Sequence, residues 1–204
     1  MKKLLILGFL VLFVPVIVYS QAKVEAPVWN IGDKWSLTGD VSIMVVSADG
    51  SSYTVKYLTP GGDSILIYEK SSLNRLYSME GDTRIQYEGR NKRLFNFPLD
   101  IGKSWKDNYT VKPTGGSAAP QEYFETFTVL GWEDIVIQAG KFRAVKLEYK
   151  QARGEERARQ TAKEGKAWYW YSPDVKYMVK CQYERTSYWG AFYDWELASF
   201  ELKK

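Results

Sequence analysis

The chain has 204 residues, 16% of them aromatic and none of them histidine, and its formal net charge at pH 7 is +4. Without histidine it lacks the commonest general base and the commonest zinc ligand, so nucleophiles activated by histidine are excluded. The near-neutral charge implies no strong attraction to nucleic acid, and a single cysteine, Cys181, allows no internal disulfide. We therefore expect no metal site, no cofactor and no nucleic-acid partner.

The first 22 residues are predicted to be a signal peptide. Lys2 and Lys3 precede an apolar run, Leu4 to Val18, and small residues follow it, with cleavage expected after Ser20 or Ala22. The alternative is an uncleaved anchor, since the run approaches a bilayer-spanning length, and only then would the protein contact a membrane. No cysteine lies directly after the run, which excludes lipid attachment by the bacterial lipoprotein route.

The remainder, residues 23–204, is expected to form one exported β-rich domain, placed in the periplasm, at the cell surface or outside the cell. Apolar and polar residues alternate with a period of two along most of it, which is typical of strands. The expected strands are residues 35–45, 53–57, 64–70, 73–80, 83–89, the end of 90–111, 122–140, 141–151, 167–175, 176–186 and 188–202.

Several irregular positions interrupt this pattern. The strand 122–140 is expected to bend at Gly131, and a slip of the apolar phase after Ala144 predicts a β-bulge in the following strand. A second slip occurs near Ala198. The loop 112–120 is rich in proline and glycine, and 152–166 is either a polar hairpin tip or a short exposed helix.

These elements predict an all-β fold, an antiparallel meander of about ten strands that forms a barrel, a half-barrel or a two-layer sandwich. No segment has the composition of a core helix. Strand order is left open.

The segment Ile-Gly-x-x-Trp occurs twice, ending at Trp35 and at Trp105. Gly32 and Gly102 can adopt the left-handed backbone that turns a chain inward, and each tryptophan would then be buried at the start of a strand. We interpret the repeat as structural; a ligand-binding pair of tryptophans is the alternative.

Three segments carry a resemblance to known proteins: FPLDIGKSW from residue 97, VIQAGKFRAVKLEY from 136 and WYSPDVKYMVK from 170. Together they resemble a broad family of exported bacterial β-rich proteins and lipoproteins of unknown function. The resemblance covers about residues 95–181, with a weaker match at 28–37. It implies an envelope or secreted location and an antiparallel β fold, and it brings no catalytic residues.

Aromatic residues gather toward the C-terminus and provide the candidate ligand-binding residues. These are Trp168, Trp170, Trp189, Tyr193 and Trp195. Aromatic platforms bind glycans, lipid chains and peptides, so a hydrophobic ligand, a glycan or an envelope protein is the expected partner. The competing interpretation is that a small all-β core simply uses large side chains to fill itself.

Candidate catalytic groups are few. Glu133 and Asp134 are neighbours on a strand and face opposite ways, whereas Asp194 and Glu196 share a face but show no glycosidase geometry. Cys181 is expected to be buried and inert. The sequence therefore favours an exported, non-catalytic ligand-binding domain. A structural envelope module with a filled core is the second hypothesis, and a hydrolase working through carboxylates the third.

Overall fold

The computed structural model describes residues 23–88, 95–114, 119–153, 165–185 and 193–204. All of its regular elements are strands. They are β1 (Lys34–Leu37), β2 (Val41–Ala48), β3 (Ser52–Thr59), β4 (Gly62–Glu69), β5 (Arg75–Glu80), β6 (Thr83–Glu88), β7 (Ser104–Thr114), β8 (Gln121–Ile137), β9 (Gly140–Arg153), β10 (Gly165–Ser172), β11 (Tyr177–Tyr183) and β12 (Trp195–Glu201).

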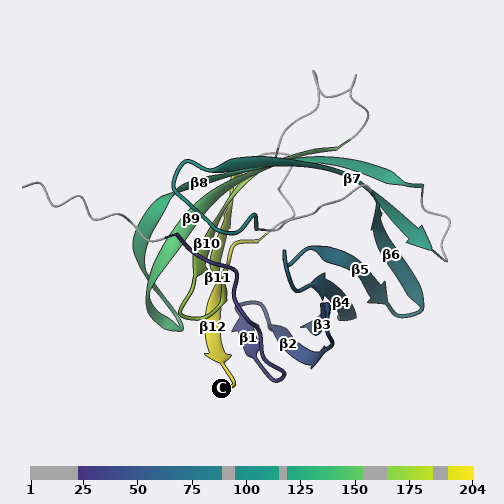
Figure 1. The fold of residues 1–204 in the computed structure, drawn as a ribbon, viewed down its shortest axis with the longest axis horizontal. Helices are drawn as coiled ribbons and strands as arrows, with labels where there is room; N and C mark the ends of the chain where they lie inside the picture. Colours follow the sequence, from purple (N-terminus) through teal and green to yellow (C-terminus); the bar gives the residue numbers. More distant parts are fainter. Residues whose placement is uncertain (1–22, 89–94, 115–118, 154–164, 186–192) are drawn as a thin grey trace, which may run out of the picture.

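Each strand pairs antiparallel with its neighbour in sequence, and β1 pairs with β12, so the sheet closes into a barrel. In Figure 1 the long strands β7, β8 and β9 arch over one side, and the shorter strands β1 to β5 curl beneath them. This confirms the all-β antiparallel meander and selects the barrel among the three predicted architectures. Within the described ranges, no helix is long and apolar enough to cross a membrane.

The barrel has twelve strands rather than about ten, and one cause is a hairpin inside the segment predicted as the single strand 35–45. The chain turns between β1 and β2, where Gly39 and Asp40 have φ angles of +80° and +59°. Leu37 and Val41 face each other directly across this hairpin. Cross-strand partners lie on the same face, so the alternation continues through the turn and conceals it.

The bulges lie close to the predicted positions. Leu130 on β8 is an extra residue between the pairs Val129–Leu147 and Gly131–Lys146, so the bulge belongs to β8 and not to β9 as predicted. The bend expected at Gly131 adjoins it. The slip predicted near Ala198 is confirmed, because Ala198 is the unpaired residue between two successive β1–β12 pairs.

Two predicted loops have different outcomes. Strand β7 continues to Thr114, with Pro113 opposite Ile85, so the expected loop at 112–120 begins later than predicted. Most of the polar tip predicted at 152–166 lies outside the described residues.

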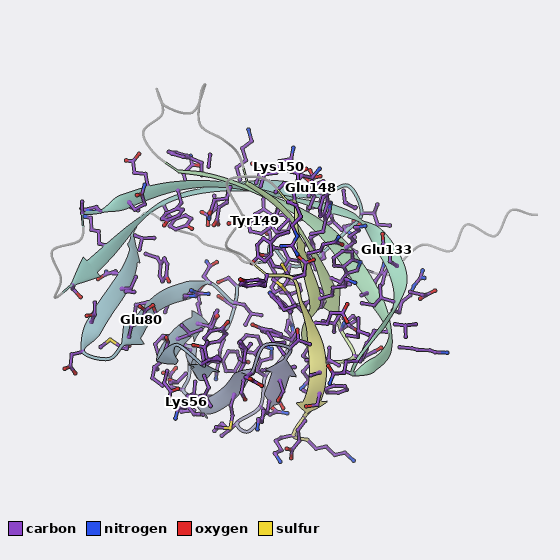
Figure 2. The ribbon with its side chains drawn as sticks, turned by 180° about the vertical axis from the view of Figure 1, so that it is seen from behind. Lys56, Glu80, Glu133, Glu148, Tyr149 and Lys150 are labelled. Carbon is purple, nitrogen blue, oxygen red and sulfur yellow. The ribbon has the colours of Figure 1, made fainter. Side chains whose placement is uncertain are left out.

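Alternation along the long strands separates the barrel interior from its surface. On β9, Tyr149 is buried inside the barrel, whereas its neighbours Glu148 and Lys150 point outward and form an ion pair of 3.5 Å (Figure 2). The core is therefore the inner face of one closed sheet.

The two Ile-Gly-x-x-Trp segments form equivalent turns. Gly32 and Gly102 have φ angles of +91° and +81°, and their N–H groups donate to the carbonyls of Val45 and Val129. Strands β1 and β7 begin directly after these turns, and Trp35 is fully buried. The structural interpretation of the repeat is confirmed.

One end of the barrel is filled by an aromatic end cluster, which consists of Trp29, Trp35, Tyr53, Tyr68 and Tyr177. The ring centroid of Trp29 lies 5.4–5.6 Å from those of Trp35, Tyr53 and Tyr68. Both indole N–H groups donate to the turn between β10 and β11, Trp29 to the Lys176 carbonyl and Trp35 to that of Val175. The cluster therefore fixes the segment before β1 across this end.

Candidate ligand-binding site

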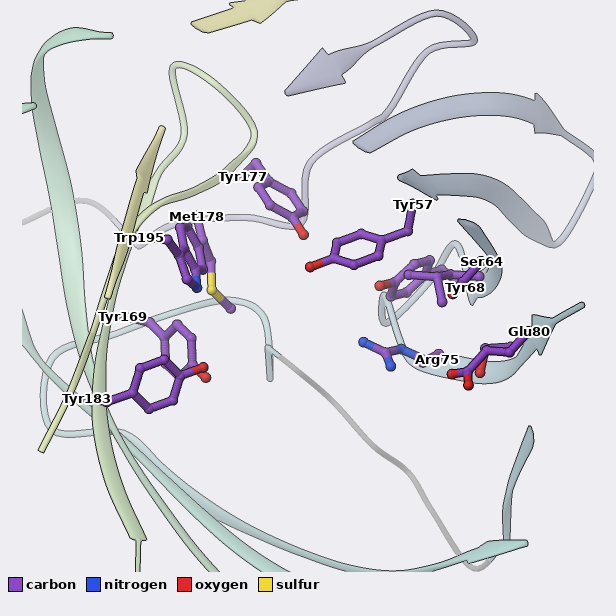
Figure 3. A pocket seen from close by; sticks show the side chains of 12 residues that line it. Tyr57, Ser64, Tyr68, Arg75, Glu80, Tyr169, Tyr177, Met178, Tyr183 and Trp195 are labelled. Atoms are coloured by element: carbon purple, nitrogen blue, oxygen red, sulfur yellow. The ribbon is translucent and has the colours of Figure 1, made fainter. Parts of the chain in front are cut away.

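A cavity of about 330 Å³ lies inside the barrel, next to the aromatic end cluster. Strands β3, β4 and β5 form one wall, and β10, β11 and β12 form the opposite wall (Figure 3). Its lining residues are Tyr57, Ser64, Leu66, Tyr68, Arg75, Ser78, Glu80, Tyr169, Tyr177, Met178, Tyr183 and Trp195. Barrel closure is what brings these two distant parts of the chain together.

Tyrosine is the most frequent residue in the described lining, and burial favours the neutral phenol at four of these positions. Burial raises the pKa of Tyr57, and it raises the pKa values of Tyr169, Tyr177 and Tyr183 further above the usual range. A neutral phenol can both donate and accept a hydrogen bond. The cavity is thus a polar-tipped aromatic space, able to hold an apolar body and to direct hydrogen bonds to it.

Arg75 is the one cation in the described lining of this cavity. Its NH1 group donates to the Tyr87 hydroxyl at 3.0 Å, and its guanidinium carbon lies 5.9 and 5.5 Å from the ring centroids of Tyr68 and Tyr87. Figure 3 shows the guanidinium directed toward the middle of the cavity, facing the hydroxyls of Tyr169 and Tyr183 across it.

A β-bulge explains why Arg75 points inward. Tyr68 pairs with Arg75 and Ile67 with Tyr77, which leaves Leu76 as an extra, exposed residue on β5. Arg75 and Ser78 therefore share the inner face, although they are three residues apart. A regular strand would place them on opposite faces.

A second, larger hollow of about 600 Å³ adjoins the cavity. The two share Tyr57, Tyr183 and Trp195 as lining residues. The remaining lining of the outer hollow is Leu37, Thr38, Gly39, Val41, Tyr193 and Asp194. Tyr193 is 81% exposed, so this outer hollow reaches the surface near the β1–β2 turn.

The structure divides the predicted ligand-binding residues between two faces. Trp195 lines both hollows and Tyr193 lines the outer one. Trp168 and Trp170 face outward on β10, because their cross-strand partners are charged or polar. Trp189 lies outside the described residues.

Charged side chains cover the two outward tryptophans. Lys166 Nζ lies 4.9 Å from the ring centroid of Trp168, and Lys146 Nζ lies 4.9 Å from that of Trp170. Trp170 is buried, and its indole N–H donates to Glu133 at 2.7 Å. These residues form a surface network, whereas Tyr169, which points inward from the same strand, lines the cavity.

Sequence reasoning did not single out Arg75, Ser78, Tyr57 or Tyr177. The one available signal was a break in the alternation after Asn74, where Arg75 and Ser78 flank the pair Leu76-Tyr77.

The carboxylates considered for catalysis are engaged in surface ion pairs. Glu133 pairs with Lys146 and Asp134 with Arg143, both at 3.0 Å. Asp194 and Glu196 likewise pair with Arg185 and Lys180, at 3.3 and 2.9 Å. The pairs of Glu133, Asp134 and Glu196 join neighbouring strands on the outer surface.

No protein-family model and no curated protein matches the chain. Similar solved structures do exist. One is an exported protein from Bacteroides fragilis with a YmcC-like fold, at 12% identity and a TM-score of 0.54, covering 88% of this chain and 100% of that one.

The chain has a fold similar to that protein's. Two further structures are proteins described as lipoproteins. YmcC from Escherichia coli has 9% sequence identity and a TM-score of 0.49, and the match covers 89% of this chain and 90% of that one. The protein from Parabacteroides distasonis has 16% identity and a TM-score of 0.48, and the match covers 89% of this chain and 100% of that one. At such identities the similarity concerns the fold alone.

Cys181 is predicted to be unreactive in the native protein. It is buried beside Tyr169 and Tyr183, and burial raises the pKa of its thiol to about 12. Since the thiolate is the reactive form, we expect Ellman's reagent at pH 8 to react at least about 100-fold more slowly with native than with urea-unfolded protein. Equal rates would show that the β10–β11 wall opens readily.

Proposed function

We propose that this chain is an exported, non-catalytic barrel protein that binds a small ligand inside the barrel. The observation that carries the proposal is the interior cavity of about 330 Å³, lined by tyrosines and one arginine and joined to an outer hollow. Ligand sites are typically concave, mostly apolar and supplied with a few polar groups, as this one is.

The interior is a better candidate than the aromatic outer surface. Lysine side chains and an ion-paired glutamate cover Trp168 and Trp170. Tyr193 and Trp195, in contrast, line space that a ligand can occupy, and the proposal keeps them as ligand contacts.

Space left inside the barrel distinguishes this proposal from the second hypothesis, a structural module. A barrel that serves as a scaffold alone can be filled completely by side chains, since interiors pack as densely as organic crystals. Here two buried polar atoms without a hydrogen-bond partner, Arg75 Nε and Ser78 Oγ, belong to residues that line a hollow instead. An aromatic lining of this kind suits a hydrophobic ligand or a glycan.

Export is proposed from the N-terminal 22 residues, with their basic start, apolar run and small residues. The missing histidine and the surface ion pairs of the acidic residues support a role in binding rather than catalysis.

Native mass spectrometry of protein purified from the envelope fraction of its own cells tests both the proposed export and the proposed ligand binding. We expect a polypeptide mass that begins after Ser20 or Ala22, together with a larger mass that loses a small molecule on collisional activation. Detection of the bare chain alone, under conditions that preserve a known lipocalin–ligand complex, would contradict ligand carriage.

A cavity-filling substitution provides the control. Ser78→Phe places a ring inside the cavity, whereas Thr126→Phe adds the same ring on the outer face of β8, opposite Lys106 and Lys150. The larger mass should disappear for Ser78→Phe and persist for Thr126→Phe. Loss in both variants, or in neither, would place the ligand elsewhere.

A further inference from the structure

We propose that the cavity selects a monocarboxylate with an apolar chain, binding its carboxylate at Arg75 and its chain toward the outer hollow. The inference rests on the proposed function and specifies the chemistry of the ligand. It follows from the charge of Arg75, from the unpaired Ser78 hydroxyl on the same inner face, and from the shape of the space beyond.

Arg75 has no ion-pair partner among the residues that the structure describes. Its guanidinium contacts the Tyr87 hydroxyl and the rings of Tyr68 and Tyr87. Its Nε is buried and unpaired. A guanidinium has five donors, and a charge removed from water is unfavourable without a counter-ion. Arg75 is partly buried, and its unpaired Nε therefore offers a donor to an acceptor that carries negative charge.

Ser78 gives an independent indication. Its side chain is 1% exposed and lines the cavity on the same face as Arg75, and its hydroxyl has no hydrogen-bond partner. Buried polar groups are nearly always paired, so an unpaired hydroxyl that shares the inner face and the cavity with an unpaired guanidinium nitrogen favours a ligand oxygen here. Both groups can donate to the same carboxylate.

The opposite wall supplies further donors. The hydroxyls of Tyr169 and Tyr183 point into the cavity from β10 and β11 (Figure 3). Because burial raises their pKa values, these phenols stay protonated and can donate to an anion. A cationic ligand would be repelled by Arg75, and the described lining of this cavity has no buried carboxylate to pair with it.

The ligand should carry a single negative charge. Arg75 is one cation, and Glu80, which is exposed, lines the same cavity from the end of β5. A second negative charge would be repelled by Glu80 and find no further cation in the described lining. The planar guanidinium also matches a carboxylate in a two-bond fork.

An apolar chain fits the space that continues from the head group. Tyr57, Tyr183 and Trp195 connect the cavity with the outer hollow, and Leu37 and Val41 line the latter. Asp194, the one acidic residue in the described lining of this hollow, is paired with Arg185. Together the two spaces have the size that drug-sized ligands occupy.

Binding of decanoate, decanol, decylamine and decyl phosphate, measured by calorimetry and by the quenching of tryptophan fluorescence, tests this assignment. Decanoate should bind most tightly. Arg75→Met should weaken decanoate about 10- to 100-fold and leave decanol unchanged, because hydrogen bonds to charged groups are lost. Arg75→Lys, which keeps the charge but not the fork, should be intermediate.

Arg143→Met is the matched control, since Arg143 lies on the outer face beside Asp134 and Trp132. It should bind decanoate like the native protein. Circular dichroism and thermal unfolding establish that each variant is folded.

The outcomes separate the two proposals. Equal binding of decanol and decanoate, with no effect of Arg75→Met, would overturn the carboxylate assignment and leave interior binding intact. Tighter binding of decyl phosphate, or of decylamine, would overturn it in the same way. Failure of all four probes, together with a bare chain in native mass spectrometry, would overturn the proposed function itself.

Discussion

Replacing Trp35 by alanine is expected to lower the free energy of unfolding by about 3–5 kcal/mol, the range measured for large aromatic truncations in cores. Trp35 is fully buried, and its ring stacks on that of Tyr177 at a centroid distance of 4.9 Å. Its indole N–H donates to the Val175 carbonyl at 2.7 Å, so truncation also leaves that carbonyl unpaired.

Urea unfolding monitored by circular dichroism measures this loss, with two other tryptophans for comparison. Trp105 occupies the equivalent position in the second repeat, stacked on Phe127 at 5.1 Å, and its truncation should also cost several kcal/mol, about 3 by the same reasoning. Trp168 lies half-buried on the outer face, and Trp168→Ala should cost about 1 kcal/mol. If Trp35→Ala cost no more than Trp168→Ala, the aromatic end cluster would not be a principal support of the barrel.

The fold class could be predicted from the sequence because the period-two pattern depends on local geometry. Each strand has one buried face, and this requires alternation wherever the sheet covers a core. The β1–β2 turn escaped detection for a related reason. Leu37 and Val41 are direct partners across the hairpin, so the pattern keeps its phase through Gly39 and Asp40.

The cavity could not be predicted in the same way. Its walls come from β3–β5 and β10–β12, which only the closure of the barrel places face to face. Arg75 was hidden further by the bulge at Leu76, which puts Arg75 and Ser78 on one face despite their odd spacing. Alternation along β10 places Trp170 and Tyr169 on opposite faces, and the charged cross-strand partners of Trp170 show that it is the one facing outward.

A buried carboxylate was also missed by sequence analysis. Glu125 on β8 is 2% exposed and faces Asp107, which is also buried, across the β7–β8 ladder. One of its oxygens accepts hydrogen bonds from the hydroxyls of Tyr109 and Tyr149, each at 2.7 Å, and from the amide of Gln151 at 2.8 Å. Three strands of the arch are therefore joined at one atom.

Replacing Glu125 by leucine is expected to lower the free energy of unfolding by about 3–5 kcal/mol, because three buried donors lose their acceptor. Glu125→Gln keeps the shape and an acceptor oxygen, and should cost about 1–2 kcal/mol, since hydrogen bonds to a neutral acceptor are weaker. Both values come from urea unfolding extrapolated to water.

A double-mutant cycle with Tyr149→Phe isolates the contribution of one donor. If the Tyr149 hydroxyl is stabilised by the carboxylate, removing it from the Glu125→Leu variant should cost less than removing it from the native protein, with a coupling energy of about 1–3 kcal/mol. Additive costs would mean that the hydroxyl draws its stabilisation from another partner. The loss on Glu125→Leu would then reflect desolvation and packing rather than the shared acceptor.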